Sequence, residues 1–177
     1  GTLRKTKSLN KNKALSFFRK SEKETKEHNM IVDMERNDLS KICKTGSVKI
    51  EKLKKVEEYR DLFHYVSTIK GLIKKNITNH EIISSLMPGG SVIGCPKIST
   101  IQLLNNKEKN DRNIYTGSFG VIHSNGDMRF NIMIRTLLNF KNNINLSVAS
   151  GVILGSTAKK EYNENYIKAK SLLELFH

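Results

Sequence analysis

The sequence predicts an α+β fold in which antiparallel strands are joined by hairpins and accompanied by helices. Helix-like and strand-like segments occur throughout the 177 residues. A strong turn signal at residues 124–127 separates two alternating stretches, and no regular succession of strand, crossover helix and parallel strand is visible. With 37% hydrophobic residues, a chain of this length fits one domain with a substantial core.

In the first half of the chain, the pattern predicts one helix followed by three strands. The helix carries the apolar pair Phe17 and Phe18. The last of the strands alternates, with Phe63 and Tyr65 on one face and His64 on the other. The predicted ranges are 14–28 for the helix, and 30–32, 48–53 and 62–69 for the strands.

The second half predicts three helices, a hairpin and a further strand. Asn79 is the predicted cap of the first helix, which ends near Pro88. The sequence Ser-Asn-Gly-Asp at residues 124–127 is typical of a type I′ hairpin turn. The predicted ranges are 79–88, 97–106 and 158–176 for the helices, 114–122 and 128–138 for the hairpin, and 145–154 for the last strand.

The chain is strongly basic, with 31 Lys and Arg against 17 Asp and Glu and a net charge of +14. No helix-turn-helix, zinc finger or aromatic stacking platform accompanies this charge, so we expect no nucleic acid partner; a basic nucleic-acid-binding module is the remote alternative. The charge can also steer an anionic small substrate toward the protein. No apolar run predicts a membrane span or a secretory signal. Cys43 and Cys95 form no disulfide or zinc pattern, and we expect a cytoplasmic protein.

Two pairs of glutamates have the spacing of a metal site. Glu24 and Glu27 lie near one end of the chain, Glu161 and Glu164 near the other, and on a helix each i, i+3 pair shares one face. Two such pairs on facing helices would form an oxygen-rich pocket suited to Mg²⁺. The alternative is that both glutamate pairs lie on solvent-exposed helix faces and bind no metal. Lys168 lies on the same arc of the helix as Glu164. It either forms a surface ion pair with Glu164, which contributes about 0.3–0.5 kcal/mol, or binds a substrate carboxylate.

A glycine-rich turn, Pro-Gly-Gly-Ser-Val-Ile-Gly-Cys-Pro-Lys, occupies residues 88–97 before a predicted helix. Such a turn can aim backbone N–H groups at an anion, and an ordinary structural loop is the alternative. It is not a Walker loop, because Cys95 and Pro96 stand where that motif requires Lys and Ser or Thr.

Taken together, these segments resemble the chorismate-utilising enzyme family. The family's fold is an antiparallel β-sheet sandwich flanked by helices, and the resemblance implies that residues 1–177 form the C-terminal part of a single chorismate-binding catalytic domain. The blocks that carry it, in order, are EHNMIVDMERNDL (27–39), HYVSTIKG (64–71), PGGSVIGCPK (88–97), IYTGSFG (114–120), MIRT (133–136), SGVILGS (150–156) and EYNENYIKAKSLL (161–173).

The resemblance implies a role for each matching residue. Glu27 and Glu164 are the implied direct Mg²⁺ ligands, and Glu24 and Glu161 complete the site directly or through water. The metal would hold the ring carboxylate of chorismate. His64 is the implied catalytic residue beside the ring. The implied substrate-binding residues are Thr2, Gly89, Gly90, Ser91, Tyr115, Arg135, Ala149 and Lys168, of which Arg135 and Lys168 would bind carboxylates.

Within the family, two segments favour the aminodeoxychorismate synthase component I branch. The sequence P-G-G-S at residues 88–91 resembles that branch, whereas anthranilate synthases more often have P-A-G-T. The sequence F-N-I-M-I-R-T at residues 130–136 points the same way. The implied reaction joins chorismate and ammonia into 4-amino-4-deoxychorismate for p-aminobenzoate and folate, with ammonia from a glutamine amidotransferase subunit or domain. Anthranilate synthase and a non-catalytic relic are the alternatives.

Several positions depart from the family pattern. The chain starts at the Gly-Thr of the family motif P-I-(K/A)-G-T, so the sequence does not include the residue before Gly1. That residue is a nucleophilic Lys in aminodeoxychorismate synthases and Ala in anthranilate synthases. Ala149 stands where Gly is usual, and residues 98–102 replace a more typical R-A-M-E-type helix start. Because the nucleophile and the general acid would lie upstream, we expect residues 1–177 alone not to convert chorismate.

Overall fold

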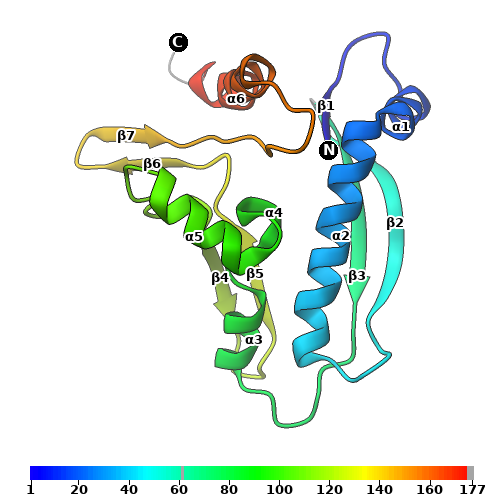
Figure 1. The fold of residues 1–177 in the computed structure, drawn as a ribbon, viewed down its shortest axis with the longest axis vertical. Helices are drawn as coiled ribbons and strands as arrows, with labels where there is room; N and C mark the ends of the chain where they lie inside the picture. The colour runs from blue at the N-terminus through cyan, green and yellow to red at the C-terminus, as the bar shows by residue number, and fades with distance from the viewer. Residues whose placement is uncertain (61, 175–177) are drawn as a thin grey trace. The chain divides into compact units, whose positions relative to one another are not determined.

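The structure, a computed structural model, describes residues 1–60 and 62–174. It divides into two compact units, Gly1–Ser91 and Val92–His177. The strand pairs described in both units are antiparallel and helices accompany them, which confirms the predicted α+β class (Figure 1). Two compact units can belong to one catalytic domain, so the single-domain assignment stays a prediction.

The first unit is a three-stranded sheet of order β1-β3-β2 packed against helices. Its core joins Ala14 and Phe18 of the first helix to Phe63 and Tyr65 of the central strand, and the rings of Phe18 and Tyr65 stack with centroids 4.7 Å apart. The helices α1 and α2 therefore cover the sheet face that carries Phe63 and Tyr65. The elements are β1 (Thr2–Arg4), α1 (Lys11–Lys20), α2 (Glu22–Ile42), β2 (Lys49–Glu58), β3 (Leu62–Lys70) and α3 (Asn79–Leu86); α4 (Gly90–Ile93) spans the boundary between the units.

The predicted strand at residues 30–32 is wrong, because this segment lies inside α2. The helix begins at Ser21, whose hydroxyl accepts the Glu24 N–H at 3.3 Å. Its buried residues recur at helical spacing, including His28, Val32 and Ile42, and this periodicity outweighs the local β propensity of Ile31 and Val32. Ser21 also ends α1, so the predicted helix at 14–28 is two helices.

The other predicted elements of this unit are present. Strands at 48–53 and 62–69 appear as β2 and β3, and β2 runs further because register shifts accommodate extra residues around Lys54, whose φ is +51°. The helix at 79–88 appears as α3, but its cap is Thr78 and not Asn79: the Thr78 hydroxyl and the Glu81 side chain form a reciprocal capping box.

The described part of the second unit, residues 92–174, contains two separate hairpins and two longer helices. The predicted hairpin is confirmed as β4 with β5, but its first strand, predicted at 114–122, begins only at Ser118, because residues 114–117 form a turn. The predicted helices at 97–106 and 158–176 are present as α5 and α6; residues 175 and 176 lie outside the described residues. The elements are α5 (Lys97–Lys107), β4 (Ser118–Ile122), β5 (Met128–Ile132), β6 (Leu137–Phe140), β7 (Asn143–Leu146) and α6 (Ala158–Leu173).

Other details of this unit also differ from the prediction. The stretch 128–138 is not one strand, because Arg135, with φ +50°, separates β5 from β6. The strand predicted at 145–154 ends at Leu146, and residues 147–157 form neither helix nor strand.

The hairpin turn is not type I′. Of Asn125 and Gly126 only Gly126 has a positive φ, +89°, and its N–H donates to the His123 carbonyl at 2.9 Å. The Asn125 side chain accepts the Asp127 N–H at 3.0 Å, a local bond that favours the ordinary turn conformation at Asn125. The connection is therefore a turn followed by one left-handed glycine.

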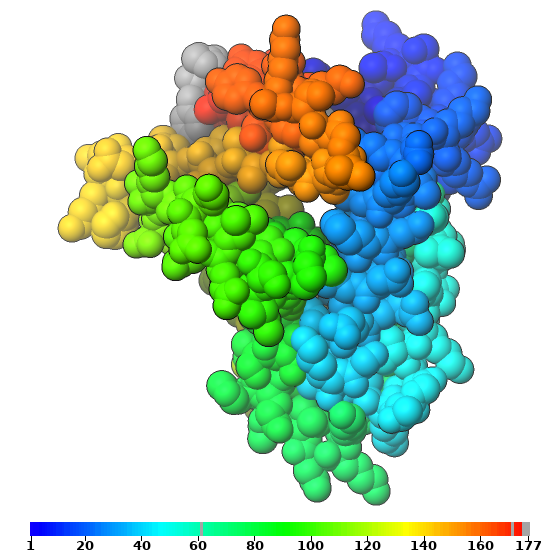
Figure 2. All heavy atoms as spheres, viewed as in Figure 1, coloured from blue at the N-terminus to red at the C-terminus, as the bar shows by residue number. Residues whose placement is uncertain are grey.

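The hairpin of β6 and β7 is a two-stranded sheet to which no further strand of the described residues is paired. Phe140 and Ile144, near its tip, are 62% and 47% exposed. In Figure 2 the tip, in yellow, stands out from the surface. Among residues 1–60 and 62–174, no helix has the combined length and apolar character needed to cross a membrane.

Candidate functional site

The first glutamate pair lies in the opening turns of α2. Glu24 and Glu27 are one turn apart and half-buried. The carboxylate of Glu24 lies so close to Gly1 that a methyl group at that position would overlap Glu24 Oε2. The structure therefore brings the start of β1, the family-like Gly1–Thr2 segment, against one of the two predicted metal carboxylates of this unit.

His28 follows directly after Glu27 and fastens α2 to the sheet. Its Nε2 lies 2.7 Å from Ser67 Oγ, which also accepts the backbone N–H of Lys54 at 2.9 Å. The ring is 7% exposed and lies against Tyr65, with centroids 4.8 Å apart. Burial lowers the pKa of His28 to about 4, and the positive charge of Lys54 acts in the same direction. The imidazole is therefore neutral at neutral pH. Sequence reasoning gave His28 no role.

Thr2 and His64 are direct cross-strand partners in β1 and β3. Because side chains alternate along a strand, His64 lies on the sheet face opposite to that of Phe63, away from α1 and α2. Its ring meets Tyr59 edge-on, with centroids 5.5 Å apart. The structure thus brings Thr2 and His64 together, and the catalytic role of His64 stays a prediction.

The glycine-rich turn is a close-packed segment. Gly89 and Gly90 are buried and Ser91 is exposed. A methyl group at Gly90 would overlap the side chain of Met34 on α2, so this position requires glycine for packing. Contact of these residues with a substrate stays a prediction.

In the second unit, three predicted site residues meet at α6. Lys168 Nζ lies 2.7 Å from Glu164 Oε1 and donates a hydrogen bond to the Ala149 carbonyl at 3.1 Å. The Lys168 and Glu164 side chains are 26% and 41% exposed, so the ion pair is partly accessible to solvent, and its role at a substrate carboxylate stays a prediction. The hydroxyl of Ser150 donates to the carbonyl of Glu161 at 3.3 Å, which fastens the same segment to the helix.

The donor atoms on α6 suit a hard cation. Glu161 is 7% exposed, so it does not lie on a solvated helix face. One turn further along, the side-chain oxygen of Asn165 is buried without a hydrogen-bond partner in the described structure. Carboxylate and carboxamide oxygens are ligands that Mg²⁺ accepts. Over residues 1–60 and 62–174, however, no group of three or more His, Cys, Asp and Glu side chains has the geometry of a metal site. The four-glutamate site stays a prediction.

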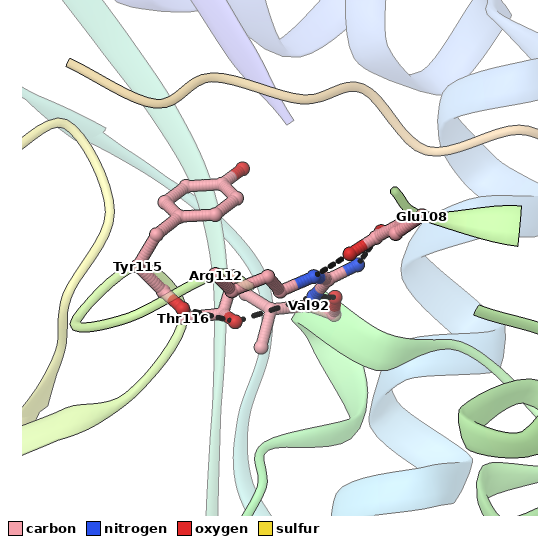
Figure 3. Close-up of polar contacts among 5 residues, drawn as sticks. All are labelled: Val92, Glu108, Arg112, Tyr115 and Thr116. Carbon is pink, nitrogen blue, oxygen red and sulfur yellow. Dashed lines mark hydrogen bonds and ion pairs between the residues drawn. The ribbon is translucent and has the colours of Figure 1, made fainter. Parts of the chain in front are cut away.

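Tyr115 lies beside an arginine that sequence reasoning missed (Figure 3). The guanidinium of Arg112 donates two parallel hydrogen bonds to Glu108, from Nε at 2.8 Å and from Nη2 at 2.6 Å. It lies over the Tyr115 ring, 5.9 Å from the centroid. Burial raises the pKa of Tyr115, against the opposing effect of the Arg112 charge. The only signal in the sequence was the i, i+4 spacing of Glu108 and Arg112.

Tyr115 and Arg135 lie at the same end of the β4–β5 hairpin. The N–H of Thr116 donates to the Met133 carbonyl, and the N–H of Met133 to the Gly117 carbonyl, both at 2.9 Å. These bonds continue the ladder past the two strands, so the segments that carry Tyr115 and Arg135 are held together. Both side chains are half-buried.

The second unit thus places Lys168 beside Glu164 on α6, and Tyr115 and Arg135 at one end of the β4–β5 hairpin. Residues 1–174 match the chorismate binding enzyme family, and the chain belongs to that family. This confirms the resemblance stated from the sequence blocks.

Similar proteins include members of two branches. An anthranilate synthase component I-like protein of Synechocystis sp. is 38% identical over 151 residues, which cover 85% of this chain and 31% of that protein. Aminodeoxychorismate synthase component 1 of Bacillus subtilis is 37% identical over 149 residues, 84% of this chain and 32% of that protein. The crystal structure of anthranilate synthase component I from Streptococcus pneumoniae superposes with a TM-score of 0.80 at 35% identity, covering 90% of this chain and 37% of that one.

The chain therefore has the fold of chorismate-utilising enzymes and spans about a third of the length of the curated relatives it matches. The identities of 38% and 37% are too close to distinguish the two branches.

Proposed function

We propose that this chain forms the C-terminal part of the catalytic domain of an aminodeoxychorismate synthase component I, which converts chorismate and ammonia to 4-amino-4-deoxychorismate. The observation that carries the proposal is the meeting of Glu164, Lys168 and the Ala149 carbonyl, three positions that family resemblance assigned to one site. The sequences at 88–91 and 130–136 favour this branch. Ammonia would come from a glutamine amidotransferase subunit or domain.

We further propose that Glu27 and Glu164 bind Mg²⁺ directly and that Glu24 and Glu161 complete the site. The half-buried pair on α2 and the buried position of Glu161 support this. A bound Mg²⁺ would neutralise the ring carboxylate of chorismate and withdraw electron density from the ring.

The side chains of this chain would bind and orient the substrate. An ammonium group has three N–H donors; Lys168 uses two for Glu164 and Ala149, and the third can bind a substrate carboxylate. Arg135 would bind a carboxylate through its planar fork. His64 would lie beside the ring, and the turn at 89–91 would contact the substrate.

The test is the conversion of chorismate by the full-length protein with Mg²⁺ and ammonium, followed by product identification. We expect an aminated ring that keeps its enolpyruvyl group. Anthranilate with released pyruvate would instead assign the protein to the anthranilate synthase branch, the second candidate that the 38% identical relative supports. A protein that leaves chorismate unchanged would contradict both.

The metal proposal has its own variants. Glu27→Gln and Glu164→Gln should each lower activity more than about 100-fold and abolish Mg²⁺ binding measured by calorimetry. The matched control is Glu22→Gln, on the same helix as Glu27, because Glu22 is 79% exposed and paired with Lys26 at 2.6 Å. Normal Mg²⁺ affinity in the Glu27 and Glu164 variants would refute the ligand assignment.

A further inference from the structure

Arg112 joins three segments of the second unit. Besides its two bonds to Glu108, at the end of α5, its Nη1 donates to the Val92 carbonyl at 3.3 Å and to Thr116 Oγ1 at 3.2 Å. Four hydrogen bonds from one planar group fix its position and that of its partners. Figure 3 shows the guanidinium between Glu108 on one side and the segment of Tyr115 and Thr116 on the other.

The segment that Arg112 holds has an unfavourable backbone conformation. Thr116 has φ +65°, in the left-handed region that β-branched residues avoid. Its side chain is part of what keeps it there: Oγ1 donates to the Tyr115 carbonyl at 2.5 Å and accepts a bond from Arg112. Such a conformation persists only where neighbouring bonds determine it, and Arg112 supplies one of them.

The same segment also determines where Arg135 lies. The backbone bond from Thr116 to Met133 joins the Tyr115 turn to the residues that follow β5, and Arg135, with φ +50°, comes two residues later. A displacement at Thr116 therefore moves both side chains that are proposed to bind the substrate.

We propose that Arg112, paired with Glu108, is a positioning residue that holds Tyr115 and Arg135 in the geometry needed to bind chorismate. The proposal rests on the proposed function for its substrate. Arg112 acts through Thr116 and the Tyr115 ring, and it needs no contact with the substrate itself.

The kinetic test is Arg112→Lys in the full-length protein. Lysine keeps the charge but cannot make the two parallel bonds to Glu108. Because displacements of about 1 Å in a site can cost about 100-fold in rate, we expect kcat/KM for chorismate to fall about 10- to 100-fold, mainly through KM. A merely structural role would lower the folded fraction, which reduces the apparent kcat and leaves KM unchanged. The matched control is Arg129→Lys, at an exposed position of β5, which should leave both constants unchanged.

A second readout does not depend on activity. In protein labelled with 3-fluorotyrosine, the ¹⁹F resonance of Tyr115, assigned with Tyr115→Phe, should shift and narrow in Arg112→Lys as the ring loses its fixed contact. The resonance of the exposed Tyr162 should not change. Glu108→Gln, which keeps one acceptor for Arg112, should produce a smaller shift of the same kind and about a 3- to 10-fold rise in KM.

The outcomes separate this inference from the proposed function. A wild-type protein that does not convert chorismate contradicts the function, while the ¹⁹F spectra still test whether Arg112 fixes Tyr115. An active protein whose KM and Tyr115 resonance are unchanged in Arg112→Lys contradicts the inference alone. If Arg112→Lys does not fold, Glu108→Gln decides: wild-type KM and an unchanged Tyr115 resonance would refute the positioning role.

Discussion

Acidification should destabilise the first unit through His28. This imidazole is 7% exposed, lies against Tyr65 and is 2.7 Å from the Ser67 hydroxyl. Its pKa is lowered from 6.5 to about 4, mainly because burial disfavours the charged ring. In the unfolded chain the same ring is solvated and keeps its ordinary pKa.

The direction follows from which state binds the proton. Between pH 6.5 and pH 4 the unfolded chain binds a proton at His28 that the folded chain does not, so stability is full above pH 6.5 and decreases as the pH falls. The slope approaches about 1.4 kcal/mol per pH unit, which gives a loss of about 2 kcal/mol at pH 5 relative to pH 7. Salt should reduce the loss, because part of the pKa shift comes from the charge of Lys54.

The measurement is urea unfolding of the wild type and of His28→Gln at pH 7, 6 and 5. Glutamine can still bond to Ser67 but does not titrate, so the stability difference between the two proteins should change by about 2 kcal/mol across this range. His80→Gln, at an exposed position of α3, is the control and should follow the wild type. A His28 ring resonance that titrates near pH 6.5, or parallel pH profiles of wild type and His28→Gln, would refute the reasoning.

Three further predictions concern packing and capping, and urea unfolding measures each of them. Phe18→Ala should lower the free energy of unfolding by about 3–5 kcal/mol, because Phe18 is fully buried. The control Phe17→Ala changes a residue that is 47% exposed and should lower it by less than about 1 kcal/mol. Equal losses in the two variants would contradict the assigned core. Gly90→Ala should lower the free energy of unfolding by about 1–3 kcal/mol, because the added methyl group overlaps Met34. In the double variant with Met34→Ala, the loss of stability should be smaller than the sum of the two single losses, and a loss equal to that sum would rule out the overlap. Thr78→Ala should cost about 1 kcal/mol by removing the α3 cap, and an unchanged stability would mean that the capping box contributes nothing.

The fold class and most elements could be predicted from the sequence because alternation and helical spacing are local signals. The exception at residues 30–32 shows the limit of a short window. Ile31 and Val32 favour a strand over three residues, but the burial of Val32 with His28 and Ile42 becomes visible only over several helical turns. The turn at Asn125 was predicted incorrectly because its side-chain bond to Asp127 competes with the conformation that the dipeptide favours.

The candidate site was predictable where its residues share a helix. The spacing of Glu164 and Lys168 indicated their ion pair, but the bond from Lys168 to Ala149 depends on the course of residues 147–157, which has no periodic signal. The role of Arg112 could not be predicted for the same reason. Its partner Val92 lies 20 positions away, and although Glu108 and Thr116 are each four positions away, no periodic pattern indicates that one guanidinium joins all three.

The β6–β7 hairpin has a practical consequence for anyone who produces residues 1–177 alone. A ribbon of two strands is marginally stable in water, and its outer edges offer unpaired backbone groups to any other extended chain. With Phe140 and Ile144 exposed beside those edges, self-association should increase with protein concentration. Charged substitutions at these two positions should yield a better-behaved sample for crystallisation or NMR.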